Sequence, residues 1–268
     1  TRRAWISPRS PLYLHYISTI LPYHDLGFVN QLGDAERRVL HLARRGLSYK
    51  AAKLGGLGLL TARLLIERGA QQIVLSSRSD RVQPGSEGDW ERLASLRADG
   101  LQIQRIRCDV SDERVVWAAV HTLRSEGRHV VGVFHAAHAL ADAMLPNQTP
   151  LHFRSTYGPK VHGAQALHAA CVSSPLRYFN LYSSVAGLLG SPGQASHSAA
   201  NASLDAMART RRGLGIRGQS VAWGAVAGIG YAARHGADRR AELSGLGAIT
   251  TVSYTHLRAP ETEADLVC

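Results

Sequence analysis

The stretch 181–208 constrains the fold of this 268-residue chain more than any other. Residues 177–182 read RYFNLY, and a short aromatic and apolar run of this kind predicts a buried strand. The Gly, Ser and Pro residues of 187–193 then predict a loop. From Ala195 the pattern becomes helical and rich in small residues, which indicates that another element packs closely against this helix. The stretch is therefore predicted to be a strand, a loop and a closely packed helix.

Three polar side chains meet around this loop. Ser184 closes the predicted strand, and His197 and Asn201 lie four residues apart on one face of the predicted helix. The strand-loop-helix order brings these three side chains near one another, which makes the loop a candidate active site.

Predicted strands and helices alternate along most of the chain. The predicted strands are 72–76, 101–108, 130–134 and 220–223, and the predicted helices are 59–68, 90–98, 112–126 and 157–171. This alternation predicts an α/β fold, a Rossmann-like doubly wound parallel sheet with helices on both faces. The first strand is doubtful, because the run RRGLSYKA at 44–51 is not the apolar strand that such a fold requires.

Four segments resemble the ketoreductase domains of modular polyketide synthases, within the short-chain dehydrogenase/reductase superfamily. They are GGLGLLTARLLIERGA at 55–70, GVFHAA at 132–137, PKVHGAQALH at 159–168 and the loop and helix of 181–208. The resemblance covers roughly 54–249. It implies NADPH-dependent reduction of a β-ketoacyl thioester to a β-hydroxyacyl thioester in polyketide or fatty-acid synthesis. It also implies an acyl carrier protein bearing the substrate, and other synthase domains, as partners.

The resemblance assigns catalytic roles to four residues. Ser184 would polarise the ketone, Asn201 would hold a water relay, and Lys160 would tune the proton donor. That donor is a Tyr in the family, thirteen residues after the Ser, where this chain has His197. A neighbouring ammonium disfavours the imidazolium, so His197 should be mostly neutral at pH 7, and its ring is shorter than a phenol. Turnover is therefore expected to be impaired; the alternatives are a His without a chemical role and a catalytically inactive structural domain.

The family's glycine motif is only partly present. Ala51 and Ala52 stand where the family has a Thr and its first glycine. The glycines that remain would let the backbone approach a pyrophosphate at the start of the following helix. These residues are Gly55, Gly56 and Gly58.

The residues at the ends of the predicted strands 72–76 and 101–108 resemble the family's contacts to the adenosine half of NADPH. Ser77 and Arg78 would hold the 2′-phosphate, whereas an NAD site would place an acid there. An Arg merely exposed in a loop is the alternative. Asp109, followed by Val110, would contact the adenine, and a helix N-cap is the competing role of the Asp.

The end of the strand 130–134 leads to the nicotinamide half of the site. His135, Ala136 and Ala137 would lie beside the cofactor ribose, and His138 stands where the family usually has a Gly.

The turn that follows bears on stereochemistry. Leu140 and Asp142 match two residues of the family's Leu-Asp-Asp, and no Trp lies in the loop between Ser184 and His197. This pattern is typical of the polyketide ketoreductases that give one configuration of the product hydroxyl. An exposed loop acid is the plain alternative for Asp142. Trp223 resembles the loop below the nicotinamide, and residues 228–246 would form the lid.

The two ends of the chain do not resemble the middle. Residues 1–45 form a poorly determined N-terminal segment, residues 46–249 the ketoreductase-like domain, and residues 250–268 a tail that looks non-native. The residues just before Gly46 have a helical spacing, and at Gly46 the chain could turn into a second helix. This arrangement is similar to the first half of the helix-turn-helix of bacterial response-regulator-type transcription regulators. A DNA-binding fusion is therefore a weaker alternative function, with the recognition helix missing.

Composition excludes several classes of protein. The net charge of +11 comes mostly from scattered Arg, so nucleic acid is not expected as a partner. No apolar run is long enough to span a bilayer, so no membrane is expected either. Three widely spaced Cys suit the cytoplasm. His162 and His168 are six apart without a third ligand, so no metal is expected.

Overall fold

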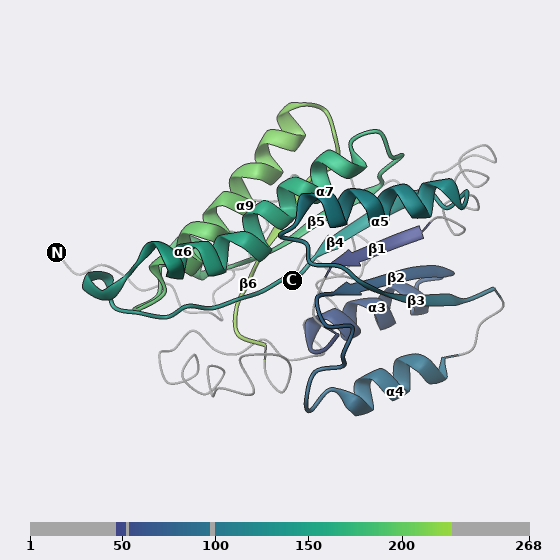
Figure 1. Ribbon diagram of the computed structural model, residues 1–268, viewed down its shortest axis with the longest axis horizontal. Coiled ribbons are helices and arrows are strands. Elements are labelled where there is room, and N and C mark those ends of the chain that lie inside the picture. Colours follow the sequence, from purple (N-terminus) through teal and green to yellow (C-terminus); the bar gives the residue numbers. More distant parts are fainter. Residues whose placement is uncertain (1–46, 52–53, 97–99, 227–268) are drawn as a thin grey trace, which may run out of the picture. The chain divides into compact units, whose positions relative to one another are not determined.

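The computed structural model describes residues 47–51, 54–96 and 100–226, with secondary structure alone for 47–51. The chain divides into two compact units, and residues 41–223 form the one that contains the sheet. Six parallel strands make this sheet in the order β3-β2-β1-β4-β5-β6 (Figure 1). They are β1 Leu47–Ala51, β2 Gln72–Ser77, β3 Gln102–Arg107, β4 Val130–His135, β5 Tyr178–Ser184 and β6 Gln219–Trp223. The order 3-2-1-4-5-6 confirms the predicted doubly wound fold.

Helices cover both faces of the sheet (Figure 1). Helices α3 (Leu57–Glu67) and α4 (Glu87–Ser95) pack on one face, in a cluster that includes Ile73 and Leu75 of β2. Helices α5 (Glu113–Ser125), α7 (Gly163–Cys171) and α9 (Ala195–Gly213) pack on the other face, in a cluster that includes Val74. Successive residues of β2 thus enter opposite layers, which is why this buried strand is apolar throughout its middle.

Strand β1 lies in the middle of the sheet although its sequence is not apolar. It pairs in parallel with β2 on one side, from Leu47 opposite Gln72, and with β4 on the other. Pairing on both edges compensates for the weak local pattern, since strand preference depends strongly on context. The first strand is therefore present. The second helix expected after Gly46 is wrong, and with it the helix-turn-helix interpretation of these residues.

The helix predicted at 157–171 begins earlier and is interrupted. Helix α6 (Pro150–Tyr157) leads into a π-helical turn, η4 (Gly158–His162), which continues into α7. Pro159 has no N–H and its ring would clash with the carbonyl one turn back, so the wider π turn accommodates it. A prediction from apolar spacing could not see this bulge, and Lys160 lies in it.

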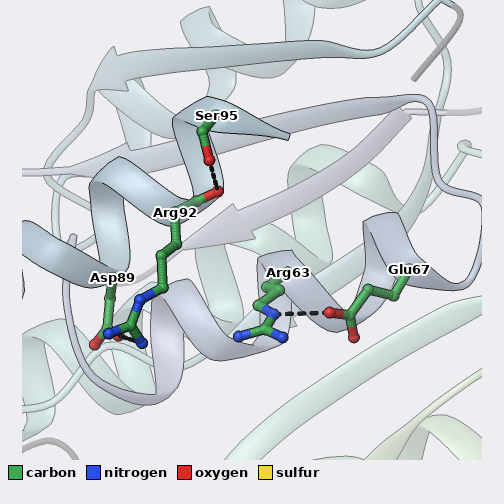
Figure 2. A network of polar contacts seen from close by, with 5 residues as sticks. All are labelled: Arg63, Glu67, Asp89, Arg92 and Ser95. Atoms are coloured by element: carbon green, nitrogen blue, oxygen red, sulfur yellow. Dashed lines mark hydrogen bonds and ion pairs between the residues drawn. The ribbon is translucent and has the colours of Figure 1, made fainter. Parts of the chain in front are cut away.

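A few polar contacts lie within α3 and within α4 (Figure 2). Arg63 Nε lies 2.7 Å from Glu67 Oε1 within α3, and an Arg92 guanidinium nitrogen lies 3.7 Å from an Asp89 carboxylate oxygen within α4. Pairs this exposed contribute at most about 1 kcal/mol each, so the buried apolar clusters carry the stability of these layers.

Several expectations fall outside the described residues: the segment 1–45, the lid at 228–246 and the tail at 250–268. The limits 46–249 of the domain therefore remain a prediction. In the part of the chain that the structure describes, no helix is both long and apolar enough to cross a bilayer.

Candidate active site

The predicted site residues follow the carboxyl ends of the parallel strands. These ends share one edge of the sheet, and the strand order reverses between β1 and β4, where doubly wound folds bind their ligands. Ser184 ends β5, His135 ends β4, and Ser77 ends β2. One edge of the sheet therefore carries residues from all three of these sequence motifs.

Lys160 is held inside the site by the strand that carries Ser184. Its side chain is only 2 % exposed, and its Nζ donates a hydrogen bond to the Tyr182 carbonyl oxygen at 3.0 Å. Burial lowers the pKa of this ammonium to about 8, against a smaller opposite effect of the Asp205 carboxylate. Near pH 7 it remains mostly charged and becomes a better acid than an exposed lysine.

His197 and Asn201 lie on the first turns of α9, as the sequence predicts. Both are buried, and Asn201 Nδ2 donates to the His197 carbonyl oxygen at 2.8 Å. Burial and then the charge of Lys160 lower the pKa of His197 to about 4, which agrees with a neutral ring at pH 7. Within the described residues, His197 Nδ1 and Asn201 Oδ1 have no hydrogen-bond partner. Two buried polar atoms are thus available to a substrate or a water.

Ser184 is positioned by the short helix α8 (Ala186–Leu189). Its Oγ accepts a hydrogen bond from the Ala186 N–H at 3.2 Å, which leaves the hydroxyl proton to donate elsewhere. Ser184 is the register partner of Trp223 in the pairing of β5 with β6. Trp223, predicted for the loop below the nicotinamide, therefore lies beside the serine predicted to bind the ketone. Trp223 is buried and its ring lies 6.0 Å from that of Tyr182.

The two histidines that depart from the family pattern contact each other. The ring centroids of His138 and His197 are 5.4 Å apart, and the ring planes are inclined by 73°. They lie 59 residues apart in the sequence and meet because the loop after β4 lies beside the start of α9.

The turn at 139–145 is joined to the loop before α9. Gln194 Nε2 donates to the exposed Asp142 carboxylate, at 3.1 Å from Oδ2, and the Ala143 N–H donates to the Gly193 carbonyl oxygen at 2.9 Å. The structure thus places Asp142 near the start of α9, with Leu140 half-buried in the same turn. Gln194 had no sequence signal, because its partner lies 52 residues away.

Asp205 is a second residue that the sequence interpretation missed. It follows Asn201 by four residues and His197 by eight, so it continues the same face of α9. Its carboxylate accepts a hydrogen bond from Ser220 Oγ of β6, and its charge acts on Lys160. The helical spacing was the signal that could have found it.

The glycine-rich turn leads directly into α3. Gly56 is the N-cap at φ +51°, a conformation that side chains rarely adopt, and no side chain caps this helix end. Gly55 is closely packed, because a Cβ there would lie 2.9 Å from Gln83 Cβ. Gly58 is buried in the first turn of the helix. An uncapped helix start without acidic residues suits an anionic pyrophosphate.

The loop after β2 is basic and partly ordered by its own hydrogen bonds. The buried Ser77 Oγ accepts from the Asp80 N–H at 3.1 Å, and the carbonyl of the exposed Arg78 accepts from Arg107 Nε at 3.2 Å. Asp80 Oδ1 lies 3.5 Å from Arg105 Nε, so this acid of the loop is paired with an arginine. The Arg78 guanidinium remains exposed, which fits a phosphate contact and equally the plain loop alternative.

Asp109 follows the end of β3, and the structure excludes one of the two roles considered for it. Asp112 is the N-cap of α5, accepting from the Arg114 N–H at 3.0 Å, so the N-cap role considered for Asp109 is wrong. Asp109 Oδ1 instead accepts from the Ser111 N–H at 3.0 Å. Val110 is buried against Gly163. A carboxylate ordered in this way at the end of β3 suits an adenine amino group.

His135 is buried towards α7 rather than towards the sheet edge. Its Nε2 donates to the Lys160 carbonyl oxygen at 2.9 Å, and burial lowers the pKa of the ring to about 4. It therefore braces the π turn that carries Lys160, and a ribose contact at this position would use its backbone. Ala136 and Ala137, which follow, are half-buried.

Taken together, an uncapped helix start, an exposed guanidinium and an ordered carboxylate fit a dinucleotide along this edge. Among the residues that the structure describes, no three His, Cys, Asp or Glu lie where they could hold a metal ion. His162 is exposed, and His168 contacts Arg211 instead.

Comparison with known proteins decides the family. Residues 53–228 match the model of the KR domain. The chain belongs to the KR, or ketoreductase, domain family of polyketide synthases. Members of this family are oxidoreductases that reduce ketones with a nicotinamide cofactor. The predicted resemblance is therefore confirmed, and so is ketoreduction as the activity of the family.

Ketoreductase domains within large synthases are similar in sequence. The phthioceranic/hydroxyphthioceranic acid synthase of Mycobacterium tuberculosis is 40% identical over 178 residues, which is 66% of this chain and 8% of the synthase. The hybrid PKS-NRPS synthetase pyvA of Aspergillus violaceofuscus is 38% identical over 67% of this chain and 4% of its own length. The chain thus spans less than a tenth of each of these curated relatives.

Solved ketoreductases share the fold. The ketoreductase from the first module of phoslactomycin biosynthesis in Streptomyces sp. HK803 has a TM-score of 0.72 and 30% identity, over 81% of this chain and 50% of that one. A-type ketoreductases from a modular polyketide synthase have a TM-score of 0.70 and 30% identity, over 80% of this chain and 44% of that one. The doubly wound sheet is thus the sheet of known ketoreductases.

Proposed function

We propose that this chain reduces a β-ketoacyl thioester to a β-hydroxyacyl thioester with NADPH, at a turnover lowered by His197. The observation that carries the proposal is the burial of the Lys160 ammonium close enough to act on His197, whose helix also carries Asn201, on the sheet edge where Ser184 ends β5. The family's chemistry needs a hydroxyl, a cation and a proton donor at this place, and only the donor differs here.

Each group at the site has its own role in the reduction. NADPH, when bound, supplies hydride to the ketone carbon. Ser184 donates its free hydroxyl proton as a hydrogen bond to the ketone oxygen and so stabilises the negative charge that develops there. The site must then deliver a proton to that oxygen.

Proton delivery is where this chain is weakest. A phenol with a pKa of about 10, lowered by a neighbouring ammonium, is a usable acid at cellular pH. With its pKa near 4, His197 is neutral instead, and a neutral imidazole gives up its N–H proton much less readily. Lys160, with a pKa of about 8, is the strongest charged acid among these groups, and Asn201 Oδ1 is available to hold a connecting water.

The cofactor preference rests on the loop after β2. Arg78 and Ser77 supply a guanidinium and a hydroxyl for a 2′-phosphate, and the nearby Asp80 is paired with Arg105 rather than aimed at a ribose. Gly55, Gly56 and Gly58 would hold the pyrophosphate, and Asp109 the adenine, from the strand ends described above.

The partners are proposed from the relatives. The matched proteins are synthases many times longer than this chain, so the substrate would arrive on an acyl carrier protein and other synthase domains would adjoin this one. Leu140, Asp142 and Trp223 would set the orientation in which the acyl chain enters. A cytoplasmic location remains a prediction from cysteine usage.

Cofactor binding is the first test. We expect NADPH to bind more tightly than NADH, measured by nicotinamide fluorescence. Arg78→Ala should weaken NADPH binding about ten- to hundredfold, since a hydrogen bond to a charged group contributes about 1.5–3 kcal/mol, and should leave NADH binding unchanged. Arg63→Ala is the matched control, because that arginine is equally exposed but pairs with Glu67 on the outer surface of α3 (Figure 2). A chain that binds neither cofactor contradicts the proposal.

Turnover is the second test. NADPH oxidation with a simple β-ketoacyl thioester should be slow in this chain and faster in His197→Tyr. Tight NADPH binding without turnover in either protein would instead support a second function, that of a catalytically inactive structural ketoreductase-like domain. The neutral, buried His197 is the observation that favours this second candidate.

A further inference from the structure

The two departures from the family pattern around the nicotinamide side of the site are not independent. His138 replaces the usual glycine after β4, and His197 replaces the tyrosine on α9. Their rings meet nearly edge to face, with centroids 5.4 Å apart. This distance is within the range of direct aromatic contact.

The contact occupies room that a glycine leaves open. A glycine at position 138 would have no side chain, so it would leave this space beside position 197 open. Here an imidazole fills that place and contributes to the burial of His197, which is 6 % exposed. Because a phenol is longer than an imidazole, a tyrosine at position 197 would press its ring or its hydroxyl against His138.

We propose that His138 is a specificity-determining residue that acts as one unit with His197, and that its ring restricts the entry of a β-keto thioester to the catalytic groups. The inference rests on the proposed function and deepens it. Restoring the tyrosine alone therefore leaves the site partly obstructed, and removing His138 alone leaves it without a good proton donor, so each single change should raise turnover only slightly.

A double-mutant cycle tests the coupling. The four proteins are the unmodified chain, His138→Gly, His197→Tyr and the double variant, assayed for NADPH oxidation with the same β-ketoacyl thioester. We expect small gains from each single change and a gain in the double variant that exceeds their product by about tenfold, in the range of measured couplings between contacting residues. Ala139→Gly in the His197→Tyr protein is the matched control for a loosened loop, and it should give no added gain.

A second measurement does not depend on turnover. Nuclear magnetic resonance titration of the His197 ring follows its protonation in the unmodified chain and in His138→Gly. If His138 covers this ring, its removal lets water in and the pKa of His197 rises from about 4 towards its ordinary value of 6.5. His138→Ala should give the same rise and guards against a folding defect specific to glycine.

The outcomes separate this inference from the proposed function. Failure of every variant to bind NADPH defeats the proposed function, and the titration of His197 still decides whether His138 covers it. If NADPH binds and His197→Tyr alone is as active as the double variant, the inference is overturned while the function stands. An unchanged His197 titration in both His138 variants also overturns it.

Discussion

Mild acid should destabilise this domain because two histidine rings are buried in their neutral form. His135 is 1 % exposed and His197 6 %, and burial is the first cause that lowers the pKa of each to about 4. In the unfolded chain both titrate near 6.5. Between pH 6.5 and 4 the unfolded chain therefore binds protons that the folded chain does not. The free energy of unfolding falls as the pH falls through this window, and the loss is complete below about pH 4.

The magnitude follows from the shift in pKa. One pKa unit corresponds to about 1.4 kcal/mol. For a ring whose pKa is 6.5 in the unfolded chain and about 4 in the folded chain, the free energy of unfolding falls by about 2 kcal/mol between pH 7 and pH 5. Two such rings lower the free energy of unfolding by about 4 kcal/mol, a large share of the stability of an ordinary domain.

Urea denaturation at pH 7 and at pH 5, followed by circular dichroism, measures this loss. We expect His135→Asn to lose about 2 kcal/mol less than the unmodified chain between the two pH values, whatever its stability at pH 7. His121→Asn, on the exposed side of α5, is the matched control and should behave like the unmodified chain. An equal loss in His135→Asn and the unmodified chain would refute the reasoning.

Three further substitutions test the packing, two of them around the site. Gly55→Ala places a Cβ 2.9 Å from Gln83 Cβ and should lower the free energy of unfolding by about 1–3 kcal/mol, whereas Gly88→Ala, with open space inside α4, should raise it by up to about 1 kcal/mol in the same urea titration. Tyr182→Phe removes the hydroxyl that lies 2.6 Å from Thr61 Oγ1 and should cost about 1–2 kcal/mol by thermal unfolding; a neutral result would show that the buried hydroxyl contributes little.

Much of the fold could be predicted locally. The apolar run at β4 was predicted to within one residue, and the small-residue helix α9 begins at Ala195 as predicted, because both follow the period of their element. The β1 strand could not be, because its formation depends on pairing with β2 and β4 rather than on its own polar sequence. The π turn η4 was not predicted for a similar reason, since apolar spacing does not show how a helix accommodates Pro159.

For the candidate site, the sequence by itself determined which chemical groups are present and where the family pattern breaks, at His138 and His197. Only the tertiary structure decided that these two rings touch, that Gln194 binds Asp142, and that Asp205 acts on Lys160. Spacing along one helix is a local property that the chain order carries. Contacts between segments tens of residues apart depend on how the strands align in the sheet, and burial, which sets the pKa values of Lys160 and the histidines, exists only once the layers have packed.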